Sequence, residues 1–339
     1  MRIGASMKTI LAALAMAMMP TSCDEAKDDE KKDNKNIYTA KDAIALVQKT
    51  HDICPSISKV VSALLEGGFD QMKRECSIQV MTPIAPMLAH PIHSLSEIKS
   101  KMDDSGNEAT MEWKYDGMRC QAHFDGSNIQ LFSRHMLNMT DQFPDVVNCL
   151  KEAMKIKVPC DDMSFVIDSE IVGVEGEGVD SRLLPFQDLS TRRKKMDDGN
   201  GIRVKVFAFD LMFLNGNSLI NEELFKRISM LRENFTETSD FSLVSSQKLD
   251  VYDESKITSF LSEAIENGAE GLVIKLLGRM STTEGNTKGN ILEKSPMNSL
   301  YEAGTRSHSW LKVKRDYVAG FSDTIDVVPI GAWWGRYVK

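Results

Sequence analysis

From Thr110 onward the sequence is dominated by short apolar runs that have the composition of β-strands. Clear examples are Ile129 to Phe132, Phe165 to Ile171, Val204 to Phe209 and Gly271 to Lys275. Helical stretches lie between these runs, and the sequence contains no internal repeat. Strands and helices mixed in this way predict an α+β fold with largely antiparallel sheets.

A helical pattern precedes this region. Apolar residues recur at helical spacing from Ala40, and a second such stretch begins at Ile57 and is expected to end at Gly67-Gly68. Prolines then punctuate the segment from Met81 to Pro91, which predicts a linker. The chain therefore divides into a helical first part and a mixed second part.

The N-terminus allows two interpretations. Arg2 and Lys8 precede an apolar run from Thr9 to Pro20, and Thr21-Ser22-Cys23 follow, as in a secretion signal. The run is too short to span a membrane, so no membrane association is expected. We favour a buried amphipathic helix and keep a secreted protein as the alternative, because apolar residues fall at helical spacing at Ile10, Leu11, Leu14 and Met18.

Composition limits the classes of protein that remain. The 339 residues leave room for two domains, and a hydrophobic fraction of 42% suffices for a packed core. The net charge of -8 argues weakly against a nucleic-acid partner, although binding depends on local patches. The six cysteines include no C-x-x-C pair, which excludes a zinc ribbon and favours free thiols in a reducing compartment.

The strongest chemical signal is the segment Glu112-Trp113-Lys114-Tyr115-Asp116-Gly117-Met118-Arg119. A lysine becomes a nucleophile only when it loses its proton, which requires burial or neighbouring positive charge. Asp116 and Gly117 fit a tight turn after Lys114, and Arg119 could hold an anionic substrate. Taken alone, Lys-x-Asp-Gly is also a common surface turn after a strand.

Other segments supply the further groups that nucleotidyl transfer needs. Glu170 stands at the end of an apolar strand, and Glu270 begins another strand, so carboxylates for a metal are present. Phe209 could stack on a base, because it lies in an aromatic-rich strand that ends in an Asn-Gly turn. Singly, each segment could be a plain strand with exposed charges.

Lysines complete the set. Lys275 ends the strand that Glu270 begins, and Lys312 and Lys314 alternate with apolar residues, so that both face one side of a strand. Phosphoryl chemistry depends mostly on positioning and charge neutralisation, for which cations and a metal are the expected parts. The segments together predict a nucleotidyl-transfer site.

In this order the segments resemble the motifs of the covalent nucleotidyltransferases, which are DNA ligases, RNA ligases and capping enzymes. The resemblance covers roughly Ile57 to the C-terminus. Further segments look like the eukaryotic replicative ligases of the DNA ligase I family, namely Ala85-Pro86-Met87-Leu88-Ala89-His90-Pro91, Phe132-Ser133-Arg134, Pro185-Phe186-Gln187-Asp188-Leu189-Ser190-Thr191-Arg192 and Ser307-His308-Ser309 before Trp310.

The resemblance implies a nuclear or organellar, monomeric enzyme of DNA replication, repair and recombination that seals nicks in double-stranded DNA. In this family a lysine attacks the α-phosphate of ATP, AMP passes to the 5′-phosphate of the nick, and the 3′-hydroxyl then displaces AMP. Lys114 would be the adenylated residue, ATP the AMP donor and Mg²⁺ the metal. A sliding-clamp contact is implied by the family alone.

The resemblance also implies roles for the other residues. Glu112 would contact the adenine and Phe209 would stack on its ring, whereas Arg119 and Arg134 would hold phosphates and ribose. Glu170 would contact the ribose.

Two further groups of residues receive roles in the same way. Glu170 and Glu270 would bind magnesium, and Lys275, Lys312 and Lys314 would meet the α-phosphate or its leaving group. The basic run Arg192, Arg193, Lys194 and Lys195 would contact the backbone of nicked DNA, with a solvated loop as the alternative.

The implied fold is an ATP-grasp-like nucleotidyltransferase (adenylation) domain over residues 83–319. Residues 1–82 would be the C-terminal part of a helical DNA-binding domain, and 320–339 the opening of a truncated OB-fold domain. Leu276 to Arg306 is longer and more polar than usual, which predicts a surface insertion. The alternatives are an inactive remnant that binds ATP or DNA without sealing, and an RNA ligase or GTP-using capping enzyme.

Overall fold

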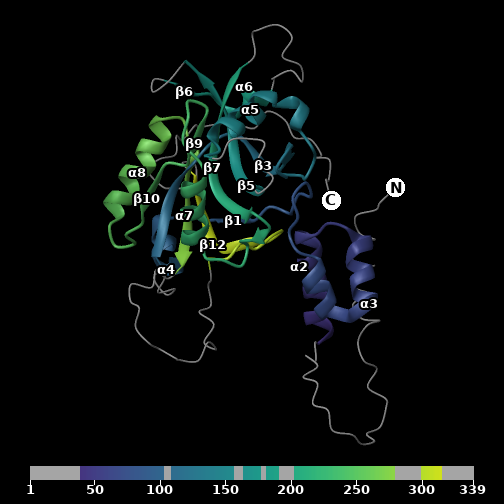
Figure 1. Cartoon of the computed structure of the whole chain (residues 1–339). Helices are drawn as coiled ribbons and strands as arrows, with labels where there is room; N and C mark the ends of the chain where they lie inside the picture. Colours follow the sequence, from purple (N-terminus) through teal and green to yellow (C-terminus); the bar gives the residue numbers. More distant parts are fainter. Residues whose placement is uncertain are drawn as a thin grey trace, which may run out of the picture.

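The computed structural model describes residues 39–102, 108–155, 163–176, 181–190, 202–278 and 299–314. A helical hairpin lies beside a larger body built on two sheets (Figure 1). The larger body confirms the predicted α+β fold with largely antiparallel sheets. Its helices, together with those of the hairpin, are α2 (Ala40–Ile53), α3 (Ile57–Glu75), α4 (Leu95–Met102), α5 (Pro144–Ala153), α6 (Phe186–Ser190), α7 (Leu224–Asn234) and α8 (Glu254–Glu266), with a 3-10 helix at Thr140–Gln142.

The hairpin of α2 and α3 has its own small core. Side chains of Thr39 and Ser56 accept hydrogen bonds from the first turns of the two helices, which fixes where each begins. The regular helix that begins at Ile57 ends at Gly67-Gly68, as predicted, and α3 includes a second helical segment after these glycines. Both glycines have non-helical backbone angles, and Gly68 has φ 67°, yet the helix resumes and continues to Glu75. The glycines therefore make a kink.

The connection from the hairpin to the sheets is fixed by hydrogen bonds to side chains of a strand. Gln121 Oε1 accepts a hydrogen bond from the backbone N–H of Ile84 at 2.8 Å, and His123 Nδ1 accepts one from Met81 at 3.1 Å. The last part of the predicted linker is strand β1 (Leu88–Pro91), which pairs with a strand far along the chain. The linker prediction is wrong there, because a four-residue strand between prolines has little sequence signal.

One sheet has the strand order β1-β12-β11-β2-β10, and the other β4-β3-β5-β7-β8, with β6 beside β5 and β9 beside β7. The pairings are antiparallel except β1 with β12 and β7 with β9. The strands are β2 (Glu108–Lys114), β3 (Met118–Phe124), β4 (Ile129–Ser133), β5 (Phe165–Glu175), β6 (Arg182–Leu183), β7 (Arg203–Leu214), β8 (Asn217–Ser218), β9 (Phe241–Leu243), β10 (Ser246–Lys248), β11 (Gly271–Gly278) and β12 (Arg306–Lys314).

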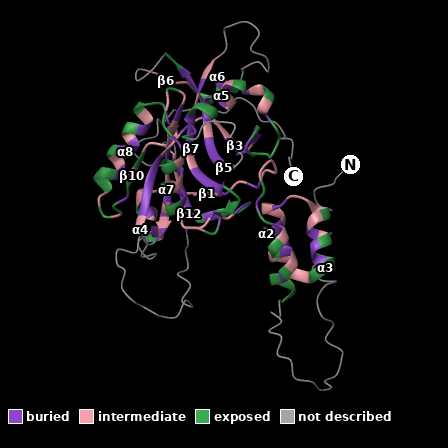
Figure 2. Cartoon of the chain, in the orientation of Figure 1, coloured by how far each residue is buried: buried purple, intermediate pink, exposed green. Residues whose placement is uncertain are grey.

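Helices cover one face of each sheet, and the long strands β5 and β7 are largely buried (Figure 2). Helices α4 and α8 pack on β2, β11 and β12, and helices α5 and α7 pack on β3, β5 and β7. The opposite faces of the two sheets are left to line a common space. Among the described helices, none is long and apolar enough to cross a membrane.

The predicted surface insertion from Leu276 to Arg306 is wrong at both ends. Leu276 is fully buried in β11, which continues to Gly278. Before β12, Tyr301 and Ala303 are 3% and 2% exposed. Residues 279–298 lie outside the described part of the chain.

A fully buried ion pair joins this last segment to the rest. The guanidinium of Arg227 on α7 binds both carboxylate oxygens of Asp210 on β7, at 2.7 and 2.9 Å. Its Nη1 donates to the carbonyls of Glu222 at 2.6 Å and Ser299 at 3.0 Å. Both ionic side chains are 0% exposed, so removal of one partner strands a charge in the interior.

We expect Arg227→Ala to lower the free energy of unfolding by about 3–5 kcal/mol, because Asp210 would be left buried and unpaired. Lys226→Ala is the matched control, since Lys226 lies next to Arg227 on α7 and forms an exposed ion pair with Glu222. It should cost at most ~0.5 kcal/mol. Urea denaturation measures both, and a loss for Arg227→Ala no greater than for the control would contradict the assigned role of the pair.

Candidate active site

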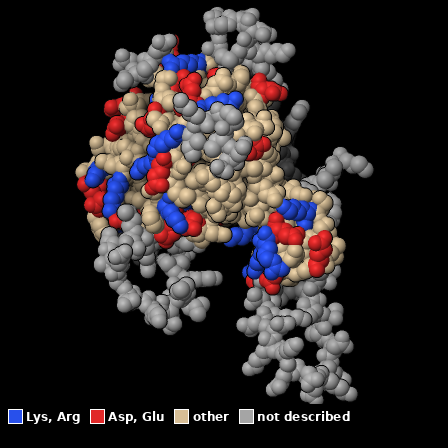
Figure 3. All heavy atoms as spheres, viewed as in Figure 1, with Lys and Arg blue, Asp and Glu red and all other residues tan. Residues whose placement is uncertain are grey.

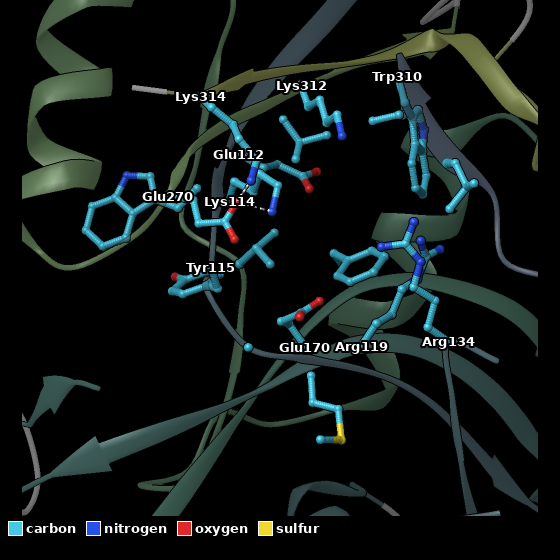
Figure 4. A pocket seen from close by; sticks show the side chains of 18 of the residues that line it. Glu112, Lys114, Tyr115, Arg119, Arg134, Glu170, Glu270, Trp310, Lys312 and Lys314 are labelled. Carbon is cyan, nitrogen blue, oxygen red and sulfur yellow. Dashed lines mark ion pairs between the residues drawn. The ribbon is translucent and has the colours of Figure 1, made fainter. Parts of the chain in front are cut away.

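The two sheets enclose a cavity of about 540 Å³ (Figure 4). The five-stranded sheet contributes Lys114 from β2, Lys275 from β11 and Lys312 from β12. The seven-stranded sheet contributes Arg119 from β3 and Glu170 from β5. The cavity therefore receives charged side chains from walls that are distant in sequence.

Lys114 is held at the end of β2 by the adjoining strands. Its carbonyl accepts a hydrogen bond from the backbone N–H of Glu270 at 2.7 Å, and Gly271 is its partner in β11. The Lys114 Nζ lies 2.7 Å from Glu270 Oε2, and Lys314 Nζ lies 2.7 Å from the same oxygen (Figure 4). A Cβ at Gly271 would lie 2.1 Å from the Val313 carbonyl, so only glycine allows this approach.

The shared carboxylate stays ionised. Burial alone would raise the pKa of Glu270, but hydrogen bonds and charge interactions with Lys114 and Lys314 lower it to about 2. Glu270 is therefore an anion that orients the side chains of Lys114 and Lys314, which stand at the ends of β2 and β12.

A second ion pair is almost completely buried. Lys275 Nζ lies 2.6 Å from Glu112 Oε2, and the side chains are 2% and 3% exposed. Burial raises the pKa of Glu112, and Lys275 opposes that shift. The ammonium also lies 4.5 Å from the ring centre of Phe209 and 4.4 Å from that of Trp310, within cation–π range. Lys275 thus contacts both Phe209 and Trp310, the two rings that form an aromatic wall of the cavity.

Phe209 reaches the cavity through a β-bulge. Asp168 pairs with Asp210 and Ser169 pairs with Ala208, so Phe209 is the extra residue in β7. A bulge redirects one side chain out of the regular alternation. The Phe209 ring accordingly lines the cavity, whereas its neighbours Ala208 and Asp210 are buried elsewhere.

Arg119 is anchored on its own sheet. Its Nε and Nη2 donate to the two carboxylate oxygens of Asp168 at 2.9 and 2.6 Å, and its Nη1 donates to the Met87 carbonyl at 2.6 Å. Asp168 is fully buried. A bidentate pair of this kind fixes the plane of the guanidinium.

Glu170 is the carboxyl group in the cavity best suited to a metal. Burial raises its pKa to about 8, which Lys114 and Arg119 oppose and the negative charges of Asp168 and Glu270 reinforce. A cation would relieve this cost of ionisation. Mg²⁺ commonly takes one or two carboxylates together with substrate phosphates, so Glu170 and Glu270 fit such an ion. Within the described residues no cluster of three or more His, Cys, Asp or Glu side chains is arranged for a metal.

Further cations lie on the rim. Arg134, Arg306 and Lys312 line the cavity, and none has a carboxylate ion-pair partner in the part of the chain that the structure describes. Burial lowers the pKa of Lys312, and the positive charges of Arg306 and Lys314 lower it further. The rim is therefore electropositive and suits phosphate groups.

The residues predicted for nucleotide and metal binding all meet in this cavity, although their individual roles stay predictions. The basic run at 192–195 lies outside the described residues. The predicted end of the β5 strand at Glu170 is wrong, because β5 continues to Glu175. The residues brought together are Glu112, Lys114, Arg119, Arg134, Glu170, Phe209, Glu270, Lys275, Lys312 and Lys314.

Sequence reasoning missed several lining residues. Val273 lies two positions before Lys275, so the two-residue period of a strand could have found it. Val244 lies in the connection between β9 and β10, where no periodicity exists. Arg306 is the last residue of the predicted surface insertion, so the sequence did not point to it as a lining residue.

A buried lysine–carboxylate cluster, an aromatic wall and an electropositive rim define a nucleotide-transfer class of site. The chain belongs to the family of ATP-dependent DNA ligase domains, whose model matches residues 86–314. The predicted resemblance to DNA ligases is thereby confirmed.

Individual relatives agree with this assignment. DNA ligase 1 of Dictyostelium discoideum is 34% identical over 348 residues, which is 99% of this chain and 27% of that protein. DNA ligase 1 of Arabidopsis thaliana is 34% identical over 344 residues, 99% of this chain and 39% of that protein. The chain thus spans well under half of either relative. The ligase domain of M. tuberculosis LigD aligns with a TM-score of 0.46 at 20% identity, over 68% of this chain and 60% of that chain.

The raised pKa of Glu170 predicts a pH-dependent stability. In the unfolded chain this carboxyl ionises near 4.5, whereas in the folded protein it ionises near 8. The wild type should therefore lose stability relative to Glu170→Gln as pH rises from 4.5 to 8, by about 1–3 kcal/mol in total. Urea unfolding at several pH values, without nucleotide or divalent cation, measures the difference.

Glu175→Gln is the matched control for that experiment. Glu175 is an exposed carboxylate at the end of the same strand, and its replacement also removes one negative charge. A stability difference between wild type and Glu170→Gln that stays constant from pH 4.5 to 8 would contradict the assigned burial of the Glu170 charge.

Proposed function

We propose that this chain is the catalytic part of an ATP-dependent DNA ligase, and that Lys114 carries AMP as a covalent intermediate. The observation that carries the proposal is the position of the Lys114 amine. It projects into the cavity and lies 2.7 Å from Glu270, which also binds Lys314. The family match over residues 86–314 supports the same assignment.

The cavity offers a place for each part of ATP. The adenine would lie against the Phe209 ring near Glu112, and the ribose near Glu170. Arg134, Lys312 and the other rim cations would neutralise the phosphates. Binding of ATP in this pose would direct the α-phosphate towards Lys114.

The first step forms a bond between Lys114 Nζ and the α-phosphorus and breaks the bond to pyrophosphate. The amine must lose its proton before it attacks. Glu270, which lies 2.7 Å from the amine and also binds Lys314, holds the Lys114 side chain in the cavity. Magnesium, when bound at Glu170 and Glu270, supplies Lewis-acid charge neutralisation.

We propose nicked duplex DNA as the second substrate. AMP would pass to the 5′-phosphate at the nick, and the 3′-hydroxyl would then displace AMP. On the face in Figure 3, acidic and basic side chains are intermixed. The net charge of -8 is a sum over the whole chain, and the positive rim of the cavity is a local feature that such a sum does not describe. Contacts from 192–195 and from the rim should make binding weaken steeply with salt.

We propose a nuclear location and a role in replication and repair, as the family resemblance implies. A monomer and a sliding-clamp contact stay predictions. The α2–α3 hairpin is proposed as part of a helical DNA-binding domain, as expected for residues 1–82.

Incubation of the chain with labelled ATP and magnesium should attach one AMP to Lys114 through an acid-labile bond. Lys114→Ala should abolish the transfer, at least about 10³-fold, since no other group replaces the nucleophile. Intact mass and peptide mapping locate the adduct. Lys248→Ala is the control, because Lys248 is an exposed lysine on the same sheet, paired with Glu108 outside the cavity.

Two outcomes would contradict the proposal. Transfer from GTP alone would indicate a capping-type enzyme. Absence of AMP on the wild type, with bound ATP still detectable, would indicate a remnant that binds the nucleotide without transfer. Joining of a fluorescently labelled nicked duplex then tests the complete reaction.

A further inference from the structure

Tyr301 is a buried residue at the back of the cavity, and no motif in the sequence pointed to it. It is 3% exposed and lies in the segment before β12 that the sequence assigned to a surface insertion. Its hydroxyl donates a hydrogen bond to Asp168 Oδ2 at 2.9 Å and accepts one from the Met87 backbone N–H at 3.1 Å. Arg119 Nη2 lies 3.4 Å from the same hydroxyl.

These contacts place Tyr301 behind Arg119. A guanidinium has five N–H donors, and four of those of Arg119 are engaged by Asp168, Met87 and Tyr301. One donor on Nη1 is left for a nucleotide. Its direction is set by the plane of the guanidinium, which Asp168 holds, and Asp168 is held in turn by the Tyr301 hydroxyl.

The ring of Tyr301 has a separate role. It packs edge-on against Trp310, with ring centres 6.1 Å apart and an interplanar angle of 87°. Trp310 packs edge-on against Phe209 at 6.2 Å, and the Arg119 guanidinium lies 5.4 Å from the Phe209 ring centre. One residue therefore supports both the cation and the aromatic wall.

The segment that carries Tyr301 is firmly fixed. The Tyr301 N–H donates to the Ile220 carbonyl at 2.9 Å, and the Gly304 N–H donates to the Ala85 carbonyl at 3.0 Å. The Ser299 carbonyl accepts from the buried Arg227. Core packing alone would need only a phenyl ring at this position, whereas the hydroxyl meets the groups that orient Arg119.

We propose that Tyr301 is a positioning residue for nucleotide binding, which orients Arg119 through Asp168 and steadies Trp310 through its ring. The proposal rests on the function proposed above and extends it to a residue that does not itself line the cavity. Because the effect is on the pose of a binding group, it concerns affinity for ATP more than the rate of chemistry.

Tyr301→Phe tests the hydroxyl alone, because it keeps the ring against Trp310. We expect the Kd for ATP, measured by calorimetry on the whole chain, to rise about tenfold. The ATP concentration for half-maximal AMP transfer should rise in parallel, while the rate at saturating ATP stays within about twofold. An unchanged Kd would overturn the proposal.

Ser169→Ala is the matched control. Ser169 is also buried, next to Asp168, and its hydroxyl donates to the Cys120 carbonyl at 3.0 Å without touching Arg119. It should lower stability by a similar amount, about 1 kcal/mol, and leave the Kd for ATP within twofold of the wild type. Equal shifts in Kd for the two variants would mean a general loss of stability and would overturn the proposal.

Asp168→Asn gives a second arm, which also serves if Tyr301→Phe does not fold. It weakens the hydrogen bonds to Arg119 directly and should raise the Kd for ATP at least as much as Tyr301→Phe does. An unchanged Kd overturns the proposal.

The double variant with Tyr301→Phe should show effects on the Kd that are clearly less than additive, since both substitutions act through Arg119, and full additivity would count against the proposal. Weaker ATP binding in Tyr301→Phe, with no AMP on the wild type, would support the positioning role and contradict the proposed transfer.

Discussion

The register between β2 and β11 is the constraint on which the site depends. It sets Lys114 opposite Gly271 and brings the Glu270 N–H onto the Lys114 carbonyl. A slip of one residue would turn every side chain of the strand to the other face, so the amine would enter the helix-covered core instead of the cavity. On the other side of β11, Gly271 allows β12 to approach closely, because the Val313 carbonyl occupies the space that a Cβ would need.

The buried charges in and around the cavity are paired, whereas the cations on its rim are not. Glu112 pairs with Lys275, Asp168 with Arg119 and Asp210 with Arg227, each with little or no exposure of the acidic partner. Such pairs cost desolvation energy and contribute little net stability, but they fix orientation. The rim cations have no comparable partner among the described residues, which leaves positive potential where the phosphates of a nucleotide would lie.

A positive cavity rim is compatible with the acidic net charge of the chain. Net charge is a sum over the whole surface, whereas binding responds to the field in one concave site. Lys312 illustrates this, since burial and the neighbouring cations lower its pKa. The same positive field would attract a phosphate group to the rim.

The sequence by itself determined the α+β class and the chemistry-bearing residues. Strand-like runs, turn residues and the types of charged side chain are local properties, and the family resemblance ordered them. Only the tertiary structure decided that Glu270 is shared by two lysines, that a bulge turns Phe209 into the cavity and that Tyr301 is buried behind Arg119. The incorrect predictions, at the linker and at the insertion, have the same cause: long-range pairing and burial override local propensity, and contacts between residues far apart in the chain leave no periodic signal.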